Sequence, residues 1–152
     1  MDEFTLLWEG PFTVSEIKEK LLRVNPEKLF KDPKYACLSW PGIYVFYDRN
    51  KMLYVGQANK GRGYPLRWRL RQHIKNETVI AKRFTENNIY INKLSIIVTP
   101  FNLENDIRII KINQIEQALI CSCMPPANVK ENIKIINEGN RGPIPEKIFL
   151  VF

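Results

Sequence analysis

The spacing of apolar residues predicts the first elements of this chain. Thr13 and Glu16 occupy the N-cap and N3 positions of a capping box, and apolar residues follow at helical spacing as far as Leu22. This pattern predicts a first helix of roughly ten residues. Three prolines between positions 26 and 41 then predict irregular backbone, because proline interrupts both helices and sheets.

Two runs of β-branched and aromatic residues, 42–47 and 51–56, predict a hairpin because turn-forming residues separate them. In a three-residue loop with Asn50 in the left-handed conformation, Tyr44 lies opposite Tyr54. Because side chains alternate along a strand, this register places both tyrosines on one face of the sheet. A four-residue loop would separate them.

The remaining pattern adds helices and one more strand. Apolar residues four positions apart predict a helix at about 66–75, and a third strand is expected at 93–98. A further helix is expected from about 106 to 120, although alternation at 107–112 leaves a strand open there. The apolar segment 148–152 is expected to add a strand or a short helix. The order of elements predicts one small α+β domain, a three-stranded antiparallel sheet flanked by helices.

Composition narrows the classes of function. The 152 residues suit one domain, and 23 Lys and Arg against 16 Asp and Glu give a net charge of +7, which favours a polyanionic partner. The single histidine, His73, excludes sites that need two histidines, such as paired-His zinc centres and 2-His-1-carboxylate iron centres.

The cysteines and the first residues indicate the compartment. Cys37, Cys121 and Cys123 fit neither a disulfide framework nor a zinc-binding pair, so we expect reduced thiols. The first residues lack the basic and apolar regions of a signal peptide, and no apolar stretch is long enough to span a membrane. We therefore expect a cytoplasmic protein without membrane contact.

An ordered set of short motifs follows the predicted elements. The tripeptides Gly42-Ile43-Tyr44 and Tyr54-Val55-Gly56 lie on the two hairpin strands, and the next helix carries Arg and His four positions apart. A helical Glu and an Asn after two prolines complete the set. In this order the motifs resemble those of the GIY-YIG nuclease family. The resemblance covers residues 41–130, a nuclease core with a GIY-YIG-like fold. Residues 1–40 are expected to form an N-terminal extension packed on this core, and residues 131–152 a C-terminal extension.

The resemblance implies a metal-dependent endonuclease that hydrolyses phosphodiester bonds in DNA, expected to be double-stranded. The implied catalytic residues are Tyr44, Tyr54, Arg69, His73, Glu116 and Asn128. One divalent ion, Mg²⁺ or Mn²⁺, is implied at Glu116, since a lone carboxylate with retained waters suits Mg²⁺.

The resemblance also implies roles for the other side chains. Arg69 would neutralise charge on the phosphate, and Tyr44 is our choice to take the proton of the attacking water. A neutral His73 would act as the acceptor that assists this tyrosine. Tyr54 would orient water or phosphate, and Asn128 would hold its loop or position Tyr44.

The residues themselves support these roles unequally. On a helical wheel Glu116 falls within the apolar face, where an unpartnered carboxylate is costly, so a cation or a strong hydrogen-bond partner is expected. A buried salt bridge with Arg69 is the alternative. For His73 a purely structural role, and for Tyr44 and Tyr54 plain aromatic packing, are the alternatives.

Positive charge gathers around the predicted helix at 66–75. Between positions 60 and 83 there are eight basic residues and one acid. Such a block is typical of phosphate binding, with a solvated basic face as the alternative. The expected DNA-binding residues are Lys60, Arg62, Arg67, Arg71 and Lys75.

The biological role is open at this stage. No separate DNA-binding domain is visible, which favours a restriction-type or mobile-element nuclease over a repair or structure-directed one. Cutting a palindrome would require a homodimer on DNA. A catalytically idle nucleic-acid-binding module with the same fold is the alternative in another class.

Overall fold

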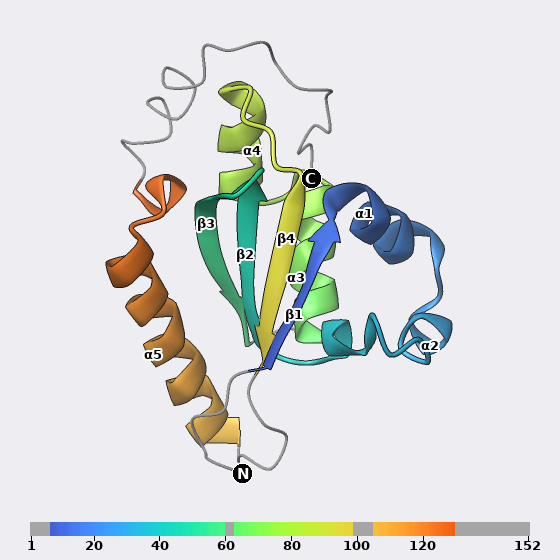
Figure 1. Cartoon of the computed structure of the whole chain (residues 1–152). Coiled ribbons are helices and arrows are strands. Elements are labelled where there is room, and N and C mark those ends of the chain that lie inside the picture. The colour runs from blue at the N-terminus through green and yellow to red at the C-terminus, as the bar shows by residue number, and fades with distance from the viewer. Residues whose placement is uncertain (1–6, 60–62, 99–104, 130–152) are drawn as a thin grey trace.

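A four-stranded antiparallel sheet organises the molecule (Figure 1). The computed structural model describes residues 7–59, 63–98 and 105–129. The strand order is β1-β4-β2-β3, and the strands are β1 (Leu7–Thr13), β2 (Gly42–Asp48), β3 (Lys51–Ala58) and β4 (Lys93–Val98). The predicted α+β class is confirmed, and the three predicted strands are present. The sheet has one strand more than predicted.

The additional strand, β1, lies at a sheet edge beside β4. Its register shifts between Glu9 and Phe12, where Gly10 and Pro11 interrupt the pattern. Because proline cannot donate to a ladder, it is tolerated at an edge or a bulge. Because these two residues break the alternation of apolar and polar positions, the sequence pattern does not predict this strand.

The predicted helices are present, together with some that the apolar pattern does not reveal. Helices α1 (Val14–Arg23) and α3 (Pro65–Ile74) agree with the sequence, and the capping box of α1 is formed. The proline-containing stretch is less irregular than expected, with short helical turns at α2 (Pro26–Leu29) and η1 (Ala36–Ser39). Helix α4 (Val79–Glu86) is not predicted.

Residues 107–112 belong to a helix and not to a strand, because α5 (Asn105–Cys123) runs through them. The chain turns after α5 into η2 (Pro126–Asn128), the short 3₁₀ helix that carries the predicted Asn. No helix in the described ranges is long and apolar enough to cross a membrane. The three cysteines are free, and the segment 148–152 lies outside the described residues.

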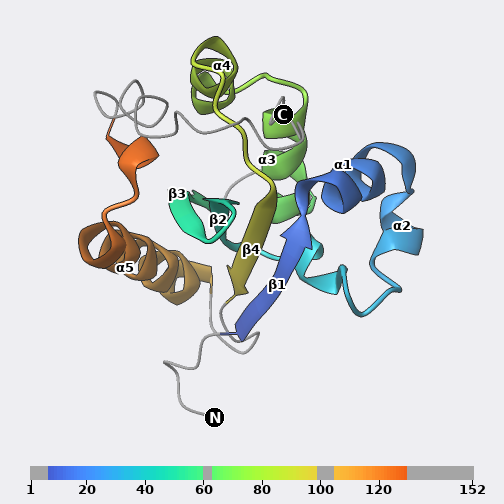
Figure 2. The ribbon, with the colours of Figure 1, turned by 45° about the horizontal axis from the view of Figure 1, so that its top comes forward.

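The sheet separates two cores. Alternate residues of β2 point to opposite faces, so Tyr44 and Phe46 pack with α1 and α3, whereas Ile43 and Val45 pack with α5. Figure 2 shows α3 and α5 on opposite sides of the strands. Both faces are therefore covered near the hairpin, where α5 also contacts β3.

The hairpin differs from its predicted register. Asp48 pairs with Lys51, so the turn has two residues, and Arg49 takes the positive φ of 58° that was expected for Asn50. Tyr44 lies opposite Gly56, not opposite Tyr54.

A bulge nevertheless keeps the two tyrosines on one face. Tyr47 pairs with Met52 and Phe46 with Tyr54, which leaves Leu53 as an extra residue in β3. A two-residue turn without this bulge would pair Tyr54 with Val45, and would place Tyr54 and the β3 residues after it on the opposite face relative to β2. The ring centroids of Tyr44 and Tyr54 are 6.3 Å apart, which confirms the prediction of a shared face.

Gly56 makes room for the phenol of Tyr44. A Cβ atom built at Gly56 would overlap ring carbons and the hydroxyl of Tyr44. Similarly, a Cβ at Gly42 would collide with the carbonyl oxygen of Ile97 on the neighbouring strand. Both motif glycines are therefore required by close approach.

We expect Gly56→Ala to destabilise the fold by about 1–3 kcal/mol, because overpacking forces the ring or the strand to move. Urea unfolding measures this loss. Lys51→Ala, at an exposed position of the same strand, is the matched control and should change stability by less than about 0.5 kcal/mol. Equal stability of the two variants would contradict the close packing.

Candidate active site

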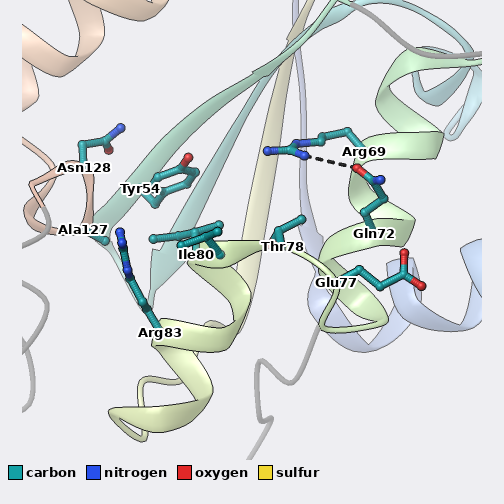
Figure 3. A pocket seen from close by; sticks show the side chains of 10 residues that line it. Tyr54, Arg69, Gln72, Glu77, Thr78, Ile80, Arg83, Ala127 and Asn128 are labelled. Atoms are coloured by element: carbon teal, nitrogen blue, oxygen red, sulfur yellow. Dashed lines mark hydrogen bonds between the residues drawn. The ribbon is translucent and has the colours of Figure 1, made fainter.

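A pocket of about 490 Å³ opens at the edge of β3, between α3, α4 and η2. Figure 3 shows Arg69 reaching from α3 toward Tyr54, with Arg83 rising from α4 and Asn128 lying beside the strand. The remaining lining residues are Gln72, Glu77, Thr78, Val79, Ile80 and Ala127. Three of the residues expected at the site therefore meet in one pocket, together with a second arginine.

Arg69 is half-buried and is oriented by its own helix. Its Nη1 donates to Oε1 of Gln72 at 3.1 Å, a contact between residues three apart on α3. Arg69 and Glu116 form no ion pair within 4.0 Å, although both lie in the described part of the chain. The alternative of a buried Arg69–Glu116 salt bridge is therefore wrong.

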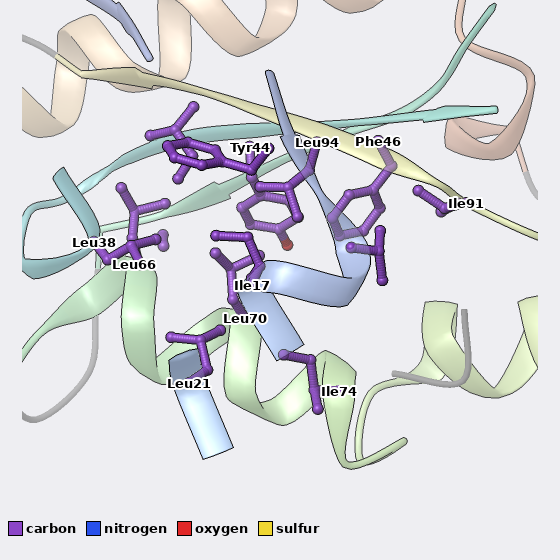
Figure 4. Packing of buried hydrophobic residues seen from close by; sticks show 14 of the residues in the cluster. Ile17, Leu21, Leu38, Tyr44, Phe46, Leu66, Leu70, Ile74, Ile91 and Leu94 are labelled. Carbon is purple, nitrogen blue, oxygen red and sulfur yellow. The ribbon is translucent and has the colours of Figure 1, made fainter. Parts of the chain in front are cut away.

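Tyr54 forms a wall of the pocket, whereas Tyr44 lies behind it. Figure 4 shows Tyr44 pointing from the sheet toward α3, among Ile17 and Leu70. Tyr44 is 1% exposed. Burial raises the pKa of both phenols, Glu116 raises them further, and the charge of Arg69 works in the opposite direction. Both tyrosines are thus within electrostatic reach of Arg69 and Glu116.

His73 links Tyr44 to the start of α4. Its Nε2 lies 2.7 Å from the Tyr44 hydroxyl, and its Nδ1 lies 2.7 Å from Oγ1 of Thr78. The imidazole is fully buried, and burial lowers the pKa of His73 to about 3. His73 is therefore neutral at neutral pH, with both ring nitrogens in hydrogen bonds.

Glu116 approaches from α5 on the other side of the sheet. Its helical neighbours Ile112, Ile115 and Leu119 belong to the second core, as the wheel predicts. The Oε2 atom is buried and has no hydrogen-bond partner in the described structure. Burial raises the pKa of this carboxyl. An orphaned buried carboxylate oxygen is what a cation site requires, so the donor fits a divalent ion.

The surroundings of Glu116 limit the kind of metal site. The described residues contain no group of three His, Cys, Asp or Glu side chains that could hold an ion together. A metal at Glu116 would keep most of its coordination positions for water or substrate oxygens. This arrangement suits Mg²⁺ better than zinc, which takes three or four protein ligands.

Asn128 pairs with the backbone of the edge strand. Its Oδ1 accepts from the Val55 N–H at 2.9 Å, and its Nδ2 donates to the Val55 carbonyl oxygen at 2.8 Å. These bonds attach η2 to β3 between Tyr54 and Gly56. Asn128 therefore holds its loop against the strand that carries Tyr54, and in the described structure its side-chain hydrogen bonds go to Val55 and not to Tyr44.

The expected DNA-binding residues are not gathered in the pocket. Arg67 and Arg71 are half-buried, Lys75 is exposed, and none of the three lines the pocket. Burial lowers the pKa of Arg67, and the charge of Arg71 adds to that effect. Lys60 and Arg62 lie outside the described residues.

Sequence reasoning missed three residues of the site. Arg83 belongs to the block of basic residues at 60–83. Because the sequence did not predict α4, nothing indicated that Arg83 lines the same pocket as Tyr54. Gln72 carried no motif, and Thr78 showed only the residue type of a helix N-cap, which it is.

The comparisons with solved structures found domains to which this chain is similar. A point mutant of the GIY-YIG N-terminal endonuclease domain of UvrC from Thermotoga maritima, bound to its catalytic divalent cation, matches at 22% identity with a TM-score of 0.47, over 75% of this chain and 96% of that one. The magnesium-bound form of the same domain matches at 22% identity with a TM-score of 0.45, over 75% and 97%. No protein-family model and no curated protein matches the chain.

We expect Asn128→Ala to lower stability by about 1–3 kcal/mol, because two hydrogen bonds to Val55 are lost. Amide hydrogen exchange at Val55 should accelerate more than exchange at the strand centre. Val129→Ala, at an exposed neighbouring position, is the control. Unchanged exchange at Val55 would show that Asn128 does not secure the edge.

Proposed function

We propose that this chain is a GIY-YIG endonuclease that hydrolyses DNA phosphodiester bonds with the help of one divalent metal ion. The observation that carries the proposal is the orphaned, buried oxygen of Glu116, within electrostatic reach of the tyrosine pair. The ordered motifs in residues 41–130, which we take as the nuclease unit, supply the remaining groups. The double-stranded form of DNA is part of the proposal.

Glu116 would hold the ion, with Mg²⁺ preferred over Mn²⁺. When bound, such an ion supplies positive charge that stabilises the developing charge on phosphate and leaving oxygens. The residues of the chain provide the rest. Arg69 and Arg83 line the same pocket, so two guanidinium groups are available for phosphate oxygens, which arginine binds with paired N–H donors.

The two tyrosines have different surroundings, which supports different roles. Tyr54 lines the pocket, which supports a role in orienting water or a phosphate oxygen. Tyr44 is hydrogen-bonded to His73 and lies against Gly56, and we assign it the proton of the attacking water. Arg69 lowers the pKa of both phenols against the effect of burial, so it supports this role as well as binding phosphate.

Asn128 acts on the site through the backbone. By bonding both polar groups of Val55, it fixes the strand segment that carries Tyr54 and Gly56. It is therefore a positioning residue.

The proposal also includes a biological role. The protein would act in the cytoplasm as a homodimer on DNA, as a restriction-type or mobile-element nuclease. The basic residues of α3 supply DNA contacts within this domain.

The proposal is tested by incubating the purified protein with supercoiled plasmid and Mg²⁺ or Mn²⁺. Linear or nicked products that disappear with chelator are expected. On a defined DNA library, a restriction or mobile-element enzyme would give cleavage products with the same repeated ends. A structure-directed enzyme would give products with scattered ends. Binding without cleavage in either metal would identify an idle module.

Glu116→Gln should reduce metal-dependent cleavage by about 100-fold or more, because the ion loses its charged ligand. In metal-free buffer its melting temperature should not fall. Burial raises the pKa of Glu116, so at pH values above that pKa the charged carboxylate destabilises the fold, and glutamine removes this effect. Gln117→Ala, an exposed neighbour on α5, is the control. Full activity of Glu116→Gln would exclude the metal role.

Arg69→Ala should slow single-turnover cleavage at saturating DNA by about 100-fold, with a much smaller loss of affinity. For Arg71→Ala we expect the opposite balance, a loss of affinity and a salt dependence reduced by about one charge. Fluorescence anisotropy over a salt series and rapid-quench cleavage separate the two effects. Equal losses of rate and affinity in Arg69→Ala would mark it as a binding residue alone.

A further inference from the structure

The outer face of α3 carries an exposed tryptophan beside arginines. Trp68 is 41% exposed, and its neighbours at helical spacing are Tyr64, the N-cap of α3, and Arg71. Tyr64 is 37% exposed, and its ring packs edge-on against Phe30 of the α2 C-cap, with ring centroids 4.5 Å apart. A strip of aromatic surface is therefore open to solvent along the first turn of a basic helix.

Two arginines on the same side of α3 lack partners. Arg67 and Arg71 are four positions apart and half-buried, and the Nε atom of each is buried with no hydrogen-bond partner in the described structure. Neither forms an ion pair with another described residue, and α3 contains no Asp or Glu. Burial lowers the pKa of Arg67, and the charge of Arg71 lowers it further. A bound anion would supply the acceptors and the negative charge that both guanidinium groups lack.

This face of α3 adjoins the pocket. Gln72 is four positions after Trp68, Arg69 follows Trp68 directly, and both Gln72 and Arg69 line the pocket (Figure 3). At 3.6 residues per turn, Trp68 lies between these two residues on one side of the helix and the pair Arg67 and Arg71 on the other. A nucleic acid strand that joins the pocket to the arginine pair would therefore pass over Trp68.

The tryptophan determines which form of nucleic acid fits. Arginines bind phosphates of paired and unpaired strands alike, because the backbone carries the same charge in both. In a duplex the faces of the bases are stacked on their neighbours and only the edges are open in the grooves, whereas an unpaired base offers its face to an aromatic ring. A second copy of this chain is a poor occupant, because its net charge of +7 would repel the arginines.

We propose that the outer face of α3 binds an unpaired stretch of a nucleic acid strand, with Trp68 stacked on a base and with Arg67 and Arg71 bonded to phosphate oxygens. This contact deepens the proposed nuclease function and rests on it for the identity of the strand as substrate. The DNA duplex would be locally unpaired where it crosses α3, next to the bond that is cut. Binding itself needs neither metal nor cleavage.

Binding is measured apart from cleavage in buffer that contains a chelator. The probes are a fluorescein-labelled single strand of about 15 thymidines and a fully paired duplex of similar length. By fluorescence anisotropy, Trp68→Ala should weaken binding of the single strand by about ten-fold and binding of the duplex by less than about two-fold. No loss for the single strand, or equal losses for both probes, would overturn the proposal.

Trp8→Ala is the matched control. Trp8 is 51% exposed, and it pairs with Ile97, whose side chain belongs to the core on the α5 side. Since residues directly opposite in a sheet share a face, Trp8 lies on the face away from α3. This variant should bind both probes as the parent does. A loss equal to that of Trp68→Ala would overturn the assignment to α3.

Trp68→Phe tests stacking directly. It keeps a ring, so it should bind the single strand more tightly than Trp68→Ala does. The single strand should quench the tryptophan fluorescence of the parent, because a base stacks on Trp68, and should not quench that of Trp68→Phe. Affinity no better than that of Trp68→Ala, or quenching that persists in Trp68→Phe, would overturn the stacking.

Arg67→Ala tests the phosphate contact. It should weaken binding of both probes and reduce the salt dependence of binding by about one charge, as proposed for Arg71→Ala. A salt dependence equal to that of the parent would overturn this contact.

Cleavage assays with Mg²⁺ or Mn²⁺ separate this proposal from the proposed function. An active parent should cut a duplex with an internal unpaired stretch about ten-fold faster than a fully paired duplex, and Trp68→Ala should remove the difference. An active parent that cuts both substrates equally would overturn the proposal and leave the nuclease function standing. A parent that binds the single strand through Trp68 but cuts neither substrate would overturn the nuclease function and leave the contact standing.

Discussion

The contact between the Tyr44 phenol and the bare backbone at Gly56 is the constraint on which the site depends. The ring passes over the edge strand where no side chain intervenes, and this brings its hydroxyl to His73 on α3. The same contact joins the hairpin to the helix that carries Arg69. A larger residue at position 56 would separate these two elements, so one missing methyl group sets the spacing between sheet and helix.

The groups of the site come from both sides of the sheet. Arg69 and His73 belong to α3, whereas Glu116 belongs to α5, which packs on the opposite face. The charges of Arg69 and Glu116 both act on the tyrosine pair, and Tyr54 lies on β3, the edge strand. If Tyr54 lay on a central strand, the sheet would separate the Glu116 carboxylate from the Arg69 guanidinium. The strand order therefore explains how both charges affect the pKa values of the same two tyrosines.

The sequence predicted the main elements, and it failed where a local feature decided the outcome. Helical and alternating periodicities located α1, α3, α5 and the strands β2, β3 and β4, because long periodic patterns reflect burial. The register of the hairpin was wrong, since the bulge at Leu53 leaves no periodic signal. Glu116 could be placed on the packed side of its helix from spacing alone. Arg83 and Thr78 could not be placed, because α4 is short and its neighbours are set by tertiary packing.

The side chain of Asn128 also changes what the edge of the sheet offers to other molecules. Exposed edge strands are templates for pairing between chains, and proteins protect them in several ways. Here an amide takes both the donor and the acceptor of Val55, the groups with which an added strand would pair. At the opposite edge, β1 contains Pro11, which has no N–H to offer. At both edges of the described sheet an added strand would therefore find at least one backbone N–H missing or already paired, and at β3 the residue that occupies it is the one that secures the candidate site.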